Sequence, residues 1–441
     1  MRKVDGLGFF WGILVGLGIM SLFFLSGWGG YRLVKNEYLS GEDYLSGDDF
    51  SLDDTQKAME EIYSLVSSQY YFTGDVDKTK MARQAIASFV NGLGDPFSSY
   101  LPPLQAKELE DNISGDESIE GIGAMLSQTE KGIIIEEVVH SSPAAQVGLM
   151  PLDIIVKVNG TGIQDQNVQE VVQLIRGPKG TSVDLTVMRM NDEGGFEIIE
   201  KTLIRDTIVI PSVSSKILSG DQGQKIGYIG LSVFASDTDS RLKKEITKLL
   251  DENIQGVILD VRGNGGGLLP ESVSVVSHFL KQGSSVTKAK YRIYNDDDYK
   301  AEGGDMLSHL PLVVITNGYS ASASEIIALA LRENRCPGST SLSVQEQGSG
   351  SVLGEDCTAV LVGERTFGKG TVQSLQNLQF GGSLKLTVGK WFSPSGISIH
   401  ELGILPDYIV ELNAEEYYGS GNDAQLEKAE ELLSQYLTMN R

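Results

Sequence analysis

The stretch Leu310-Pro-Leu-Val-Val-Ile-Thr-Asn-Gly-Tyr-Ser-Ala-Ser-Ala-Ser-Glu-Ile326 joins a short apolar run to the start of a helical pattern. Residues 310–316 are rich in Val, Leu and Ile and predict a buried strand, whereas residues 324–333 predict a helix. Three serines separated by alanines lie between them. The first N–H groups of a helix are unpaired and its amino-terminal end is positive. The stretch therefore predicts an α/β fold in which backbone donors surround a serine hydroxyl.

A second motif, Thr366-Phe-Gly-Lys-Gly-Thr-Val-Gln373, follows an apolar run at 359–363 that predicts another strand. A serine hydroxyl is a weak nucleophile until a base takes its proton, and a lysine can do so when burial lowers its pKa from about 10.4. Lys369 lies between two glycines, which allow a sharp turn that aims the side chain inward. The two motifs together predict a hydrolase that uses Ser322 and Lys369.

Two other interpretations of these residues compete with a Ser-Lys site. Ser322-Ala-Ser-Glu325 fits the S-x-x-E capping box, in which the hydroxyl and the carboxylate only satisfy N–H groups at the helix start. A Ser-His-Asp site is the chemical alternative. It is not favoured, because none of the four histidines lies in a nucleophile-elbow context and G-x-S-x-G does not occur around Ser322. His400 is a candidate for the border of the cleft.

The run Gly256-Val-Ile-Leu-Asp-Val-Arg-Gly-Asn-Gly-Gly-Gly-Leu-Leu269 predicts a strand that ends in a glycine-rich turn before a helix. A nucleotide site is not favoured, because residues 263–268 lack the last glycine of G-x-G-x-x-G and no GKS/T ending follows. Glycine backbone can approach a substrate oxygen closely and offer it an N–H group. The turn is therefore expected to supply part of an oxyanion hole.

These motifs resemble those of the carboxyl-terminal processing proteases, the tail-specific, PDZ-containing serine peptidases of bacteria. The resemblance runs from about Leu52 to Leu412. It implies a nucleophilic serine, a general-base lysine, a glutamine that orients the lysine, and two oxyanion donors. In that order the residues are Ser322, Lys369, Gln373, Ala323 and Gly266. The family's turn often reads Asn-Asn-Pro-Gly-Gly where this chain has Gly-Asn-Gly-Gly-Gly, so the choice of glycine donor stays open.

Residues 118–207 alternate short strands with two helical pieces and resemble the family's PDZ domain. In PDZ domains a peptide adds as a strand beside a groove, and backbone N–H groups hold its terminal carboxylate. The resemblance implies that Gly121, Ile122 and Gly123 bind the substrate, and that the partners are proteins with accessible apolar carboxyl termini. Relatives have an arginine near Arg176 that couples the PDZ domain to the catalytic site. An arginine that caps a helix end is the alternative.

The whole chain is expected to be a multidomain α/β protein with an open-sheet Ser-Lys peptidase core at residues 208–412. Helical periodicity at 52–66 and 80–90 predicts an amino-terminal helical module that spans 52–117. Residues 413–441 contain an amphipathic helix that could cap the core or join two subunits. A homodimer therefore stays open as an alternative to a monomer.

Length and charge narrow the class of protein. A chain of 441 residues with 41% hydrophobic residues is long enough for two or three domains with real cores. Its 59 acidic residues exceed its 36 basic residues and give a net charge of −23, which argues against nucleic-acid partners and against docking on anionic lipid. The excess charge suits a well-solvated extracytoplasmic surface.

The amino terminus predicts a membrane anchor. Residues 6–31 carry no charge, and this run exceeds the roughly 20 apolar residues that span a bilayer. Arg2 and Lys3 precede it and are expected to stay in the cytoplasm. Residues 1–31 are therefore predicted to be one transmembrane helix in the cell membrane, with the rest of the chain outside. A cleaved signal peptide, which would make the protein secreted, is the alternative. The acidic repeat in 32–51 predicts a flexible linker.

An insertion at residues 336–357 separates the serine and lysine motifs by more than is usual for the family. The only two cysteines of the chain, Cys336 and Cys357, bracket it. Outside the membrane they could form a disulfide that stabilises the fold by about 3 kcal/mol. Reduced thiols are the alternative, and a metal site is not expected because no histidine pair lies nearby. No cofactor is expected.

The expected function is that of an extracytoplasmic serine endopeptidase that recognises carboxyl termini through a PDZ domain and cleaves at or near them. A protein of another class fits part of the pattern, namely a catalytically silent, membrane-anchored PDZ scaffold that binds chain ends without cutting. The intact serine, lysine and glutamine set favours the enzyme.

Overall fold

The computed structural model describes residues 51–440 except for 73, 75, 116–117, 130–131, 140–141, 165, 191–194, 210, 337–351, 355, 413–416 and 418–421. The chain divides into two compact units, Met1–Lys78 and Thr79–Arg441. The predicted membrane anchor and nearly all of the acidic linker lie outside the described residues. Within the described ranges, no helix is both long enough and apolar enough to cross a membrane.

The first unit contains helix α2 (Leu52–Gln69), which begins where its sequence predicts. The Ser51 hydroxyl oxygen accepts a hydrogen bond from the N–H of Asp54, and the Asp54 carboxylate accepts one from the Ser51 N–H. This reciprocal pair satisfies two N–H groups that a helix start leaves free. None of the residues of α2 is buried. Local capping and helix propensity therefore account for this helix better than burial does.

The α/β core of the second unit is built on a six-stranded sheet. Five neighbouring strands are parallel, and the first strand pairs antiparallel at one edge. Three central strands, β12, β15 and β16, are buried along their whole length, as the continuous runs of Val, Ile and Leu predict for a sheet covered on both faces. In spatial order the strands are β10 (Val213–Ser219), β11 (Lys225–Leu231), β12 (Gly256–Asp260), β15 (Leu312–Thr316), β16 (Ala359–Gly363) and β19 (Tyr408–Ile409).

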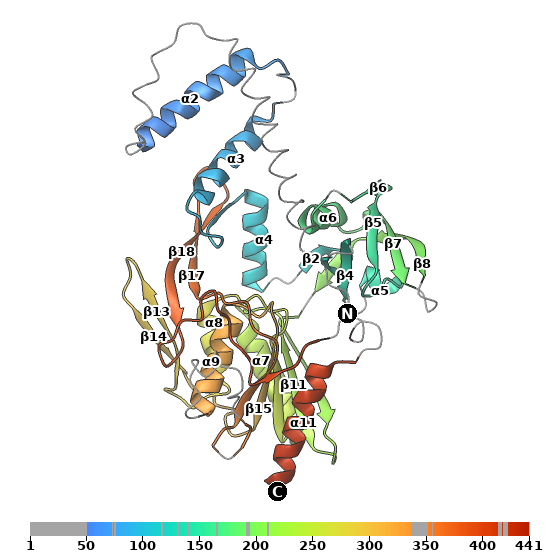
Figure 1. The fold of residues 1–441 in the computed structure, drawn as a ribbon, viewed down its shortest axis with the longest axis vertical. Coiled ribbons are helices and arrows are strands. Elements are labelled where there is room, and N and C mark those ends of the chain that lie inside the picture. Colours follow the sequence, from blue (N-terminus) through green and yellow to red (C-terminus); the bar gives the residue numbers. More distant parts are fainter. Residues whose placement is uncertain are drawn as a thin grey trace, which may run out of the picture. The chain divides into compact units, whose positions relative to one another are not determined.

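Helices cover the two faces of this sheet (Figure 1). On one face lie α7 (Thr238–Asp251), α8 (Leu269–Ser277) and α9 (Ala323–Arg335), which share a core with alternate strand residues such as Leu259. On the other face, α11 (Ala424–Met439) packs against the intervening strand residues. The carboxyl-terminal helix therefore caps the core, which was one of its two expected roles.

A second sheet adjoins the core and carries part of the cleft. Its strand order is β1-β18-β13-β14, and β17 pairs with β18. Strand β1 comes from within the predicted helical module, so that module is not wholly helical: helices α3 (Lys78–Asn91) and α4 (Pro103–Ser114) flank a strand that belongs to this sheet. The strands are β1 (Ser99–Leu101), β13 (Ser285–Tyr291), β14 (Asp297–Lys300), β17 (Thr371–Asn377) and β18 (Ser383–Phe392).

The predicted PDZ segment forms its own β-rich domain around a separate hydrophobic core. Its main sheet has the order β3-β4-β5-β7-β8, with β6 on β5, and a two-stranded β2-β9 sheet accompanies it. Two short helices, α5 (Pro143–Gln146) and α6 (Val168–Ile175), complete the domain. The strands are β2 (Ser118–Gly121), β3 (Ala124–Thr129), β4 (Gly132–Val138), β5 (Ile154–Val158), β6 (Thr161–Gly162), β7 (Ser182–Met190), β8 (Phe196–Ile204) and β9 (Asp206–Val209).

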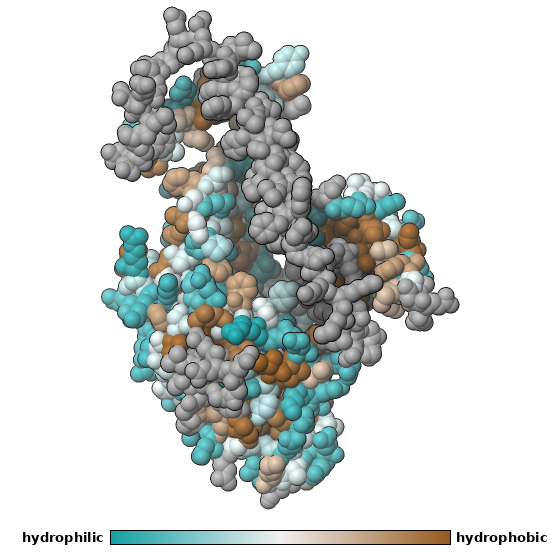
Figure 2. Space-filling view, viewed as in Figure 1, coloured by the Kyte–Doolittle hydropathy of each residue, from teal (hydrophilic) through white to brown (hydrophobic). Residues whose placement is uncertain are grey.

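The surface of the core is mainly hydrophilic on the face shown in Figure 2, with smaller hydrophobic patches between the hydrophilic residues. This agrees with the acidic composition, because charged side chains lose little by staying in water. The protein is thus a multidomain α/β protein with a helical amino-terminal part, a β-rich domain at the predicted PDZ segment and an open-sheet core.

Candidate active site

Ser322 lies where β15 turns into α9, as the sequence predicts, and it lines a cleft. The other two serines of the motif are buried. The Ser320 hydroxyl donates to the carbonyl of Val261, and the Ser324 hydroxyl donates to the carbonyl of Asn264, each at 2.8 Å. The flanking serines therefore fasten the turn to the neighbouring strand end. Ser322 is left as the serine of this motif that can meet a substrate.

The backbone of Ser322 has a φ of 54°, a conformation that residues other than glycine rarely adopt. Strained residues of this kind cluster at functional sites. The Ser322 N–H donates to the carboxylate of Glu325 at 2.8 Å, which is one half of the predicted capping box. Capping therefore occurs, but it does not remove Ser322 from the cleft.

The Glu325 side chain is buried and joins the two sequence motifs. Its carboxylate accepts hydrogen bonds from the N–H groups of Ser322, Gly368 and Lys369 and from the hydroxyl of Thr366, at 2.6 to 2.9 Å. Burial raises the pKa of Glu325, and these four hydrogen bonds act in the opposite direction. The sequence pattern indicated only a capping role, because the contacts with residues 366–369 arise from tertiary packing.

Lys369 is half-buried and reaches the same cleft as Ser322. Burial lowers the pKa of Lys369, and the nearby Lys385 lowers it further, whereas Glu325 and Asp95 act in the opposite direction. The preceding Gly368 has a φ of 91°, and a Cβ there would lie 2.8 Å from the backbone nitrogen of Gly403. The predicted need for glycine beside the lysine is therefore explained by a close backbone approach.

Gln373 lies on β17 and lines the cleft with Lys369. Its Nε2 donates to the hydroxyl oxygens of Thr371 and Thr387 at 2.8 and 3.2 Å. These contacts occupy the amide protons, so Oε1 is the atom that remains for a lysine proton. No hydrogen bond joins Gln373 to Lys369 in the described structure, and the predicted orienting contact is therefore not formed here.

In the glycine-rich turn, the backbone N–H of Gly266 is not free to act as the expected oxyanion donor. The N–H of Gly266 donates to Asn264 Oδ1 at 2.9 Å, so the predicted oxyanion donor is already occupied. Asn264 is buried, and its own amide donates to the carbonyl of Leu231. A Cβ at position 266 would lie 2.9 Å from Ser322 Cβ and 3.1 Å from the nitrogen of Ala323. Glycine is required here because it keeps the space in front of these two residues open.

The residues assigned to the reaction come from distant segments and line one cleft of about 600 Å³. This volume is typical of ligand sites in proteins. Much of the wall is apolar and comes from Leu269, Tyr299, Ile326, Val372 and Trp391, and helix α4 contributes Leu109, Asn112 and Ile113. The cleft therefore brings together Ser322, Lys369, Gln373, Ala323 and Gly266 beside a surface suited to uncharged side chains.

A polar cluster behind the glycine turn was not predicted. Arg262 forms ion pairs with Asp260 at 2.6 Å and with Asp423 at 2.7 Å. Asp423 also accepts a hydrogen bond from Leu426 at the start of α11. The cluster thus ties the strand end that precedes the turn to the carboxyl-terminal helix. No sequence signal joins residues so far apart in the chain.

The PDZ residues predicted from the sequence meet at one pocket of about 220 Å³. Gly121, Ile122, Gly123 and Arg176 all line it, together with the apolar Leu126, Val139, Val172, Ile175 and Ile208. Gly123 has a φ of 76°, and a Cβ there would overlap Ser142, so only glycine fits. Arg176 follows α6, and its guanidinium lies 3.7 Å from the carboxylate of Glu108 on α4. It therefore contacts a helix that also lines the larger cleft.

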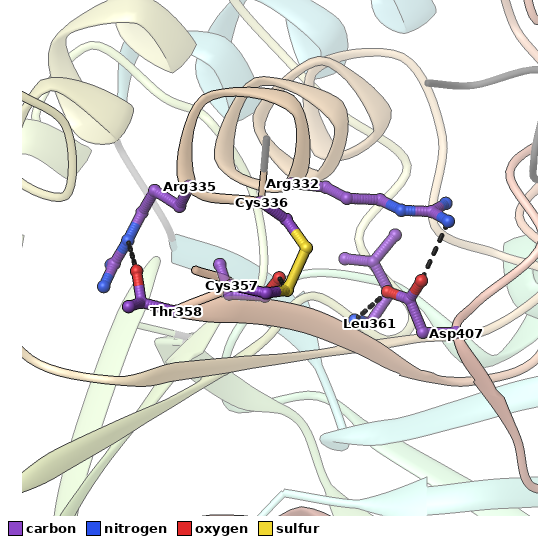
Figure 3. The surroundings of a disulfide bond; sticks show 8 residues. Arg332, Arg335, Cys336, Cys357, Thr358, Leu361 and Asp407 are labelled. Atoms are coloured by element: carbon purple, nitrogen blue, oxygen red, sulfur yellow. Dashed lines mark hydrogen bonds and ion pairs between the residues drawn. A yellow bond between two sulfur atoms is a disulfide. The ribbon is translucent and has the colours of Figure 1, made fainter. Parts of the chain in front are cut away.

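The predicted disulfide between Cys336 and Cys357 is present (Figure 3). Both cysteines are buried beside the sheet, so the bond belongs to the core and not to an exposed loop. Arg332, one turn earlier on α9, forms an ion pair of 2.8 Å with Asp407. Nearly all of the insertion between the cysteines lies outside the described residues. In the described part of the chain, no group of three or more His, Cys, Asp or Glu residues could hold a metal ion.

Comparisons with known proteins identify both parts of the second unit. Peptidase family S41 matches residues 225–338 and 340–410, and the PDZ domain family matches residues 112–188. The carboxy-terminal processing protease CtpA of Bacillus subtilis (strain 168) is 35% identical over 399 residues, which cover 88% of this chain and 77% of that protein.

A probable CtpA-like serine protease of Staphylococcus aureus (strain COL) is 33% identical over 358 residues, which cover 80% of this chain and 64% of that relative. Among solved structures, the photosystem II D1 C-terminal processing protease matches with a TM-score of 0.53 at 25% identity, over 86% of this chain and 92% of that one. The fold, the cleft and these relatives agree: the chain belongs to peptidase family S41 and is a serine-type carboxy-terminal processing protease with a PDZ domain.

Proposed function

We propose that this chain is an extracytoplasmic endopeptidase that recognises protein carboxyl termini through its PDZ domain and cleaves with Ser322 and Lys369. One observation carries the proposal: both side chains lie in one cleft, and the loops that hold them are joined by the buried carboxylate of Glu325. Because this shared carboxylate fixes the backbone of both loops, it supports a reaction that needs the two side chains in the same cleft.

The reaction begins when the neutral amine of Lys369 takes the proton of Ser322 Oγ and the oxygen attacks the scissile carbonyl carbon. The tetrahedral intermediate then breaks its C–N bond, and the Lys369 ammonium gives its proton to the leaving amine. Water hydrolyses the acyl-Ser322 ester by the same proton transfers. Burial and Lys385 hold the pKa of Lys369 below its usual value, which favours the neutral amine that the first step needs. Gln373 is proposed to orient Lys369 by accepting a hydrogen bond from its Nζ through Oε1.

The oxyanion is proposed to bind the N–H of Ala323, the first residue of α9. The positive end of the helix adds to the attraction. Gly266 serves by leaving space beside this N–H, because any side chain would fill it. Its own N–H would become a second donor only if the bound substrate displaced Asn264 from it.

Substrate choice is assigned to the PDZ pocket. Its glycine-containing loop and apolar walls suit a terminal carboxylate and an apolar last side chain. Arg176 is proposed to couple peptide binding in the PDZ pocket to the catalytic cleft, because it contacts Glu108 on α4 and this helix also lines the cleft. Cleavage of tails would then depend on both sites.

An extracytoplasmic location is proposed from two features. The uncharged run at residues 6–31 has the length of a membrane anchor, and the Cys336–Cys357 disulfide suits an oxidising compartment. Protease added to intact cells should clip the membrane-bound chain, and peptide mapping without reductant should show the linked cysteines. Full protection from protease, or free thiols, would argue against this location.

The experiment that separates the enzyme from a silent PDZ scaffold uses the full chain in detergent. An unfolded test protein that ends in apolar residues is incubated with wild type, with Ser322→Ala, and with Ser240→Ala, which changes an exposed serine on α7. New peptide ends detected by mass spectrometry with wild type and Ser240→Ala, but not with Ser322→Ala, are expected. Binding of the test protein without any cleavage by wild type would favour the scaffold.

A further inference from the structure

A turn that precedes the PDZ domain in sequence reaches the lysine of the active site. The Nζ atom of Lys369 lies 5.4 Å from the ring centroid of Phe97, within the distance at which an ammonium is attracted to an aromatic face. The same ring makes an edge contact with Phe367 at 6.3 Å and lies 6.1 Å from the ring of His400. Phe97 is thus packed against the loop that carries Lys369.

Hydrogen bonds hold this turn in place. The Asp95 carboxylate accepts from the N–H of Phe97 at 3.0 Å and from the hydroxyl of Ser98 at 2.6 Å. The Ser98 hydroxyl oxygen accepts in turn from the N–H of Thr387 at 3.0 Å. Thr387 also accepts from Gln373, as described above. One connected set of bonds therefore links the backbone of Phe97 to the glutamine of the cleft.

We propose that Phe97 is a positioning residue for Lys369. The ring of Phe97 forms a cation–π contact with the ammonium that arises when Lys369 takes the proton from Ser322. This inference deepens the proposed function and rests on it. The proton leaves Ser322 Oγ, resides on Lys369 Nζ, and passes to the leaving amine. While it resides there, the new positive charge faces the negative face of the ring, so the ring stabilises a charge that develops during the reaction.

Several ionisable groups near Lys369 and Phe97 also affect the charge on Lys369, and a test must leave them unchanged. Lys385 on β18 opposes a charge on Lys369, whereas Glu325 on α9 and Asp95 on the turn favour it. His400 is the remaining titratable neighbour of the Phe97 ring. Phe97 adds an attraction that carries no charge of its own, so a substitution of Phe97 leaves all four of these groups in place.

The test compares Phe97→Leu, which keeps an apolar side chain without an aromatic face, with Phe97→Tyr, which keeps the face. Turnover of an internally quenched peptide with an apolar carboxyl end is measured against pH with the full chain in detergent. Phe97→Leu should lower the plateau and move the midpoint of the rising limb down by about 0.4–1.5 pH units, the range that cation–π contacts span. Phe97→Tyr should keep both values.

A matched control is Phe380→Leu, which removes an exposed aromatic ring that contacts Tyr100 of the same segment and does not line the cleft. It should leave the pH profile unchanged. A fall in the plateau of Phe97→Leu without a shift of the midpoint would overturn the inference, because a merely structural role lowers the rate without changing the protonation of Lys369.

A second measurement does not depend on turnover. In the Ser322→Ala background, acylation of Lys369 by an amine-reactive reagent is followed against pH by peptide mapping, with and without Phe97→Leu. The labelling midpoint should shift down in Phe97→Leu by the same amount as the rate midpoint. An unchanged labelling midpoint would remove this inference alone, whereas full turnover by Lys369→Ala would remove the proposed function on which it rests.

Discussion

The backbone N–H of Lys369 donates a 2.9 Å hydrogen bond to the carboxylate of Glu325, and the same carboxylate accepts the N–H of Ser322 at 2.8 Å. One buried side chain therefore sets the positions of the two loops that carry the reacting groups. A displacement of about 1 Å in such a pair can cost two orders of magnitude in rate. Loss of the contact between the loops is thus expected to lower the rate although both reacting groups are still present.

Replacing Glu325 by glutamine should reduce kcat at least tenfold. An amide group presents N–H protons to neighbours that are themselves donors, and unsatisfied buried groups cost about 1–3 kcal/mol each in the free energy of unfolding. Turnover and urea unfolding measure the two effects. Glu333→Gln is the control, since Glu333 also accepts hydrogen bonds on α9 but lies with Ser395 outside the cleft. Equal turnover in both variants would show that Glu325 does not position the loops.

Gly266→Ala should lower the cleavage rate much more than Gly265→Ala. A Cβ at 266 would meet Ser322 and the N–H of Ala323 and would need an unfavourable φ of 107°, whereas a Cβ at 265 meets nothing within 4 Å. Single-turnover rates with a peptide substrate, together with thermal unfolding of each variant, separate a blocked site from a misfolded one. Similar rates in the two variants would contradict the assignment of this space to the oxyanion.

The pH dependence should follow the neutral amine of Lys369. Because the base acts unprotonated, the rate should rise with pH through the pKa of Lys369, which burial lowers from its ordinary value. Lys385→Gln removes the like charge that lowers this pKa further, so the rising limb should move to higher pH. Lys390→Gln changes an exposed lysine on the same strand outside the cleft and should leave the limb in place. An identical limb in Lys385→Gln and wild type would count against Lys369 as the titrating base.

Tail recognition should depend on the free carboxylate of the substrate. Hydrogen bonds to charged groups contribute about 1.5–3 kcal/mol, so amidation of the last residue should weaken binding roughly ten- to a hundredfold. A terminal aspartate should also bind less well, because its charge would enter an apolar pocket. Calorimetry with Ser322→Ala compares the three peptides. Equal affinities would mean that this PDZ domain does not read chain ends.

The sequence predicted best those elements that local pattern determines. The strand at 359–363 has identical bounds in the structure, because a continuous buried run between turn residues leaves little freedom. The helix predicted at 324–333 is observed as α9 (Ala323–Arg335), with its capping carboxylate in place. The disulfide was also predicted, since only one pairing of two cysteines exists.

What the sequence could not predict depends on long-range pairing. Strand β1 joins the sheet of β18, nearly three hundred residues later in the chain, and this pairing is what brings Phe97 to Lys369. The second role of Glu325 and the occupied N–H of Gly266 are likewise tertiary: each depends on a neighbour that no local motif contains. The Gln373 contact with Lys369 was expected from the resemblance and is not formed in the described structure, where Nε2 donates to two threonines.

The central claim is that Ser322 and Lys369 act as one catalytic unit, and the most direct measurement is turnover by Ser322→Ala, Lys369→Ala and the double variant. Groups that act together lose nearly the whole rate when either is removed, and removal of both costs little more. The account predicts that each single variant falls to background while the fold, measured by circular dichroism and unfolding, is kept, and that the double variant is no slower. Substantial turnover by purified Ser322→Ala, or losses in the single variants that simply multiply in the double variant, would contradict it.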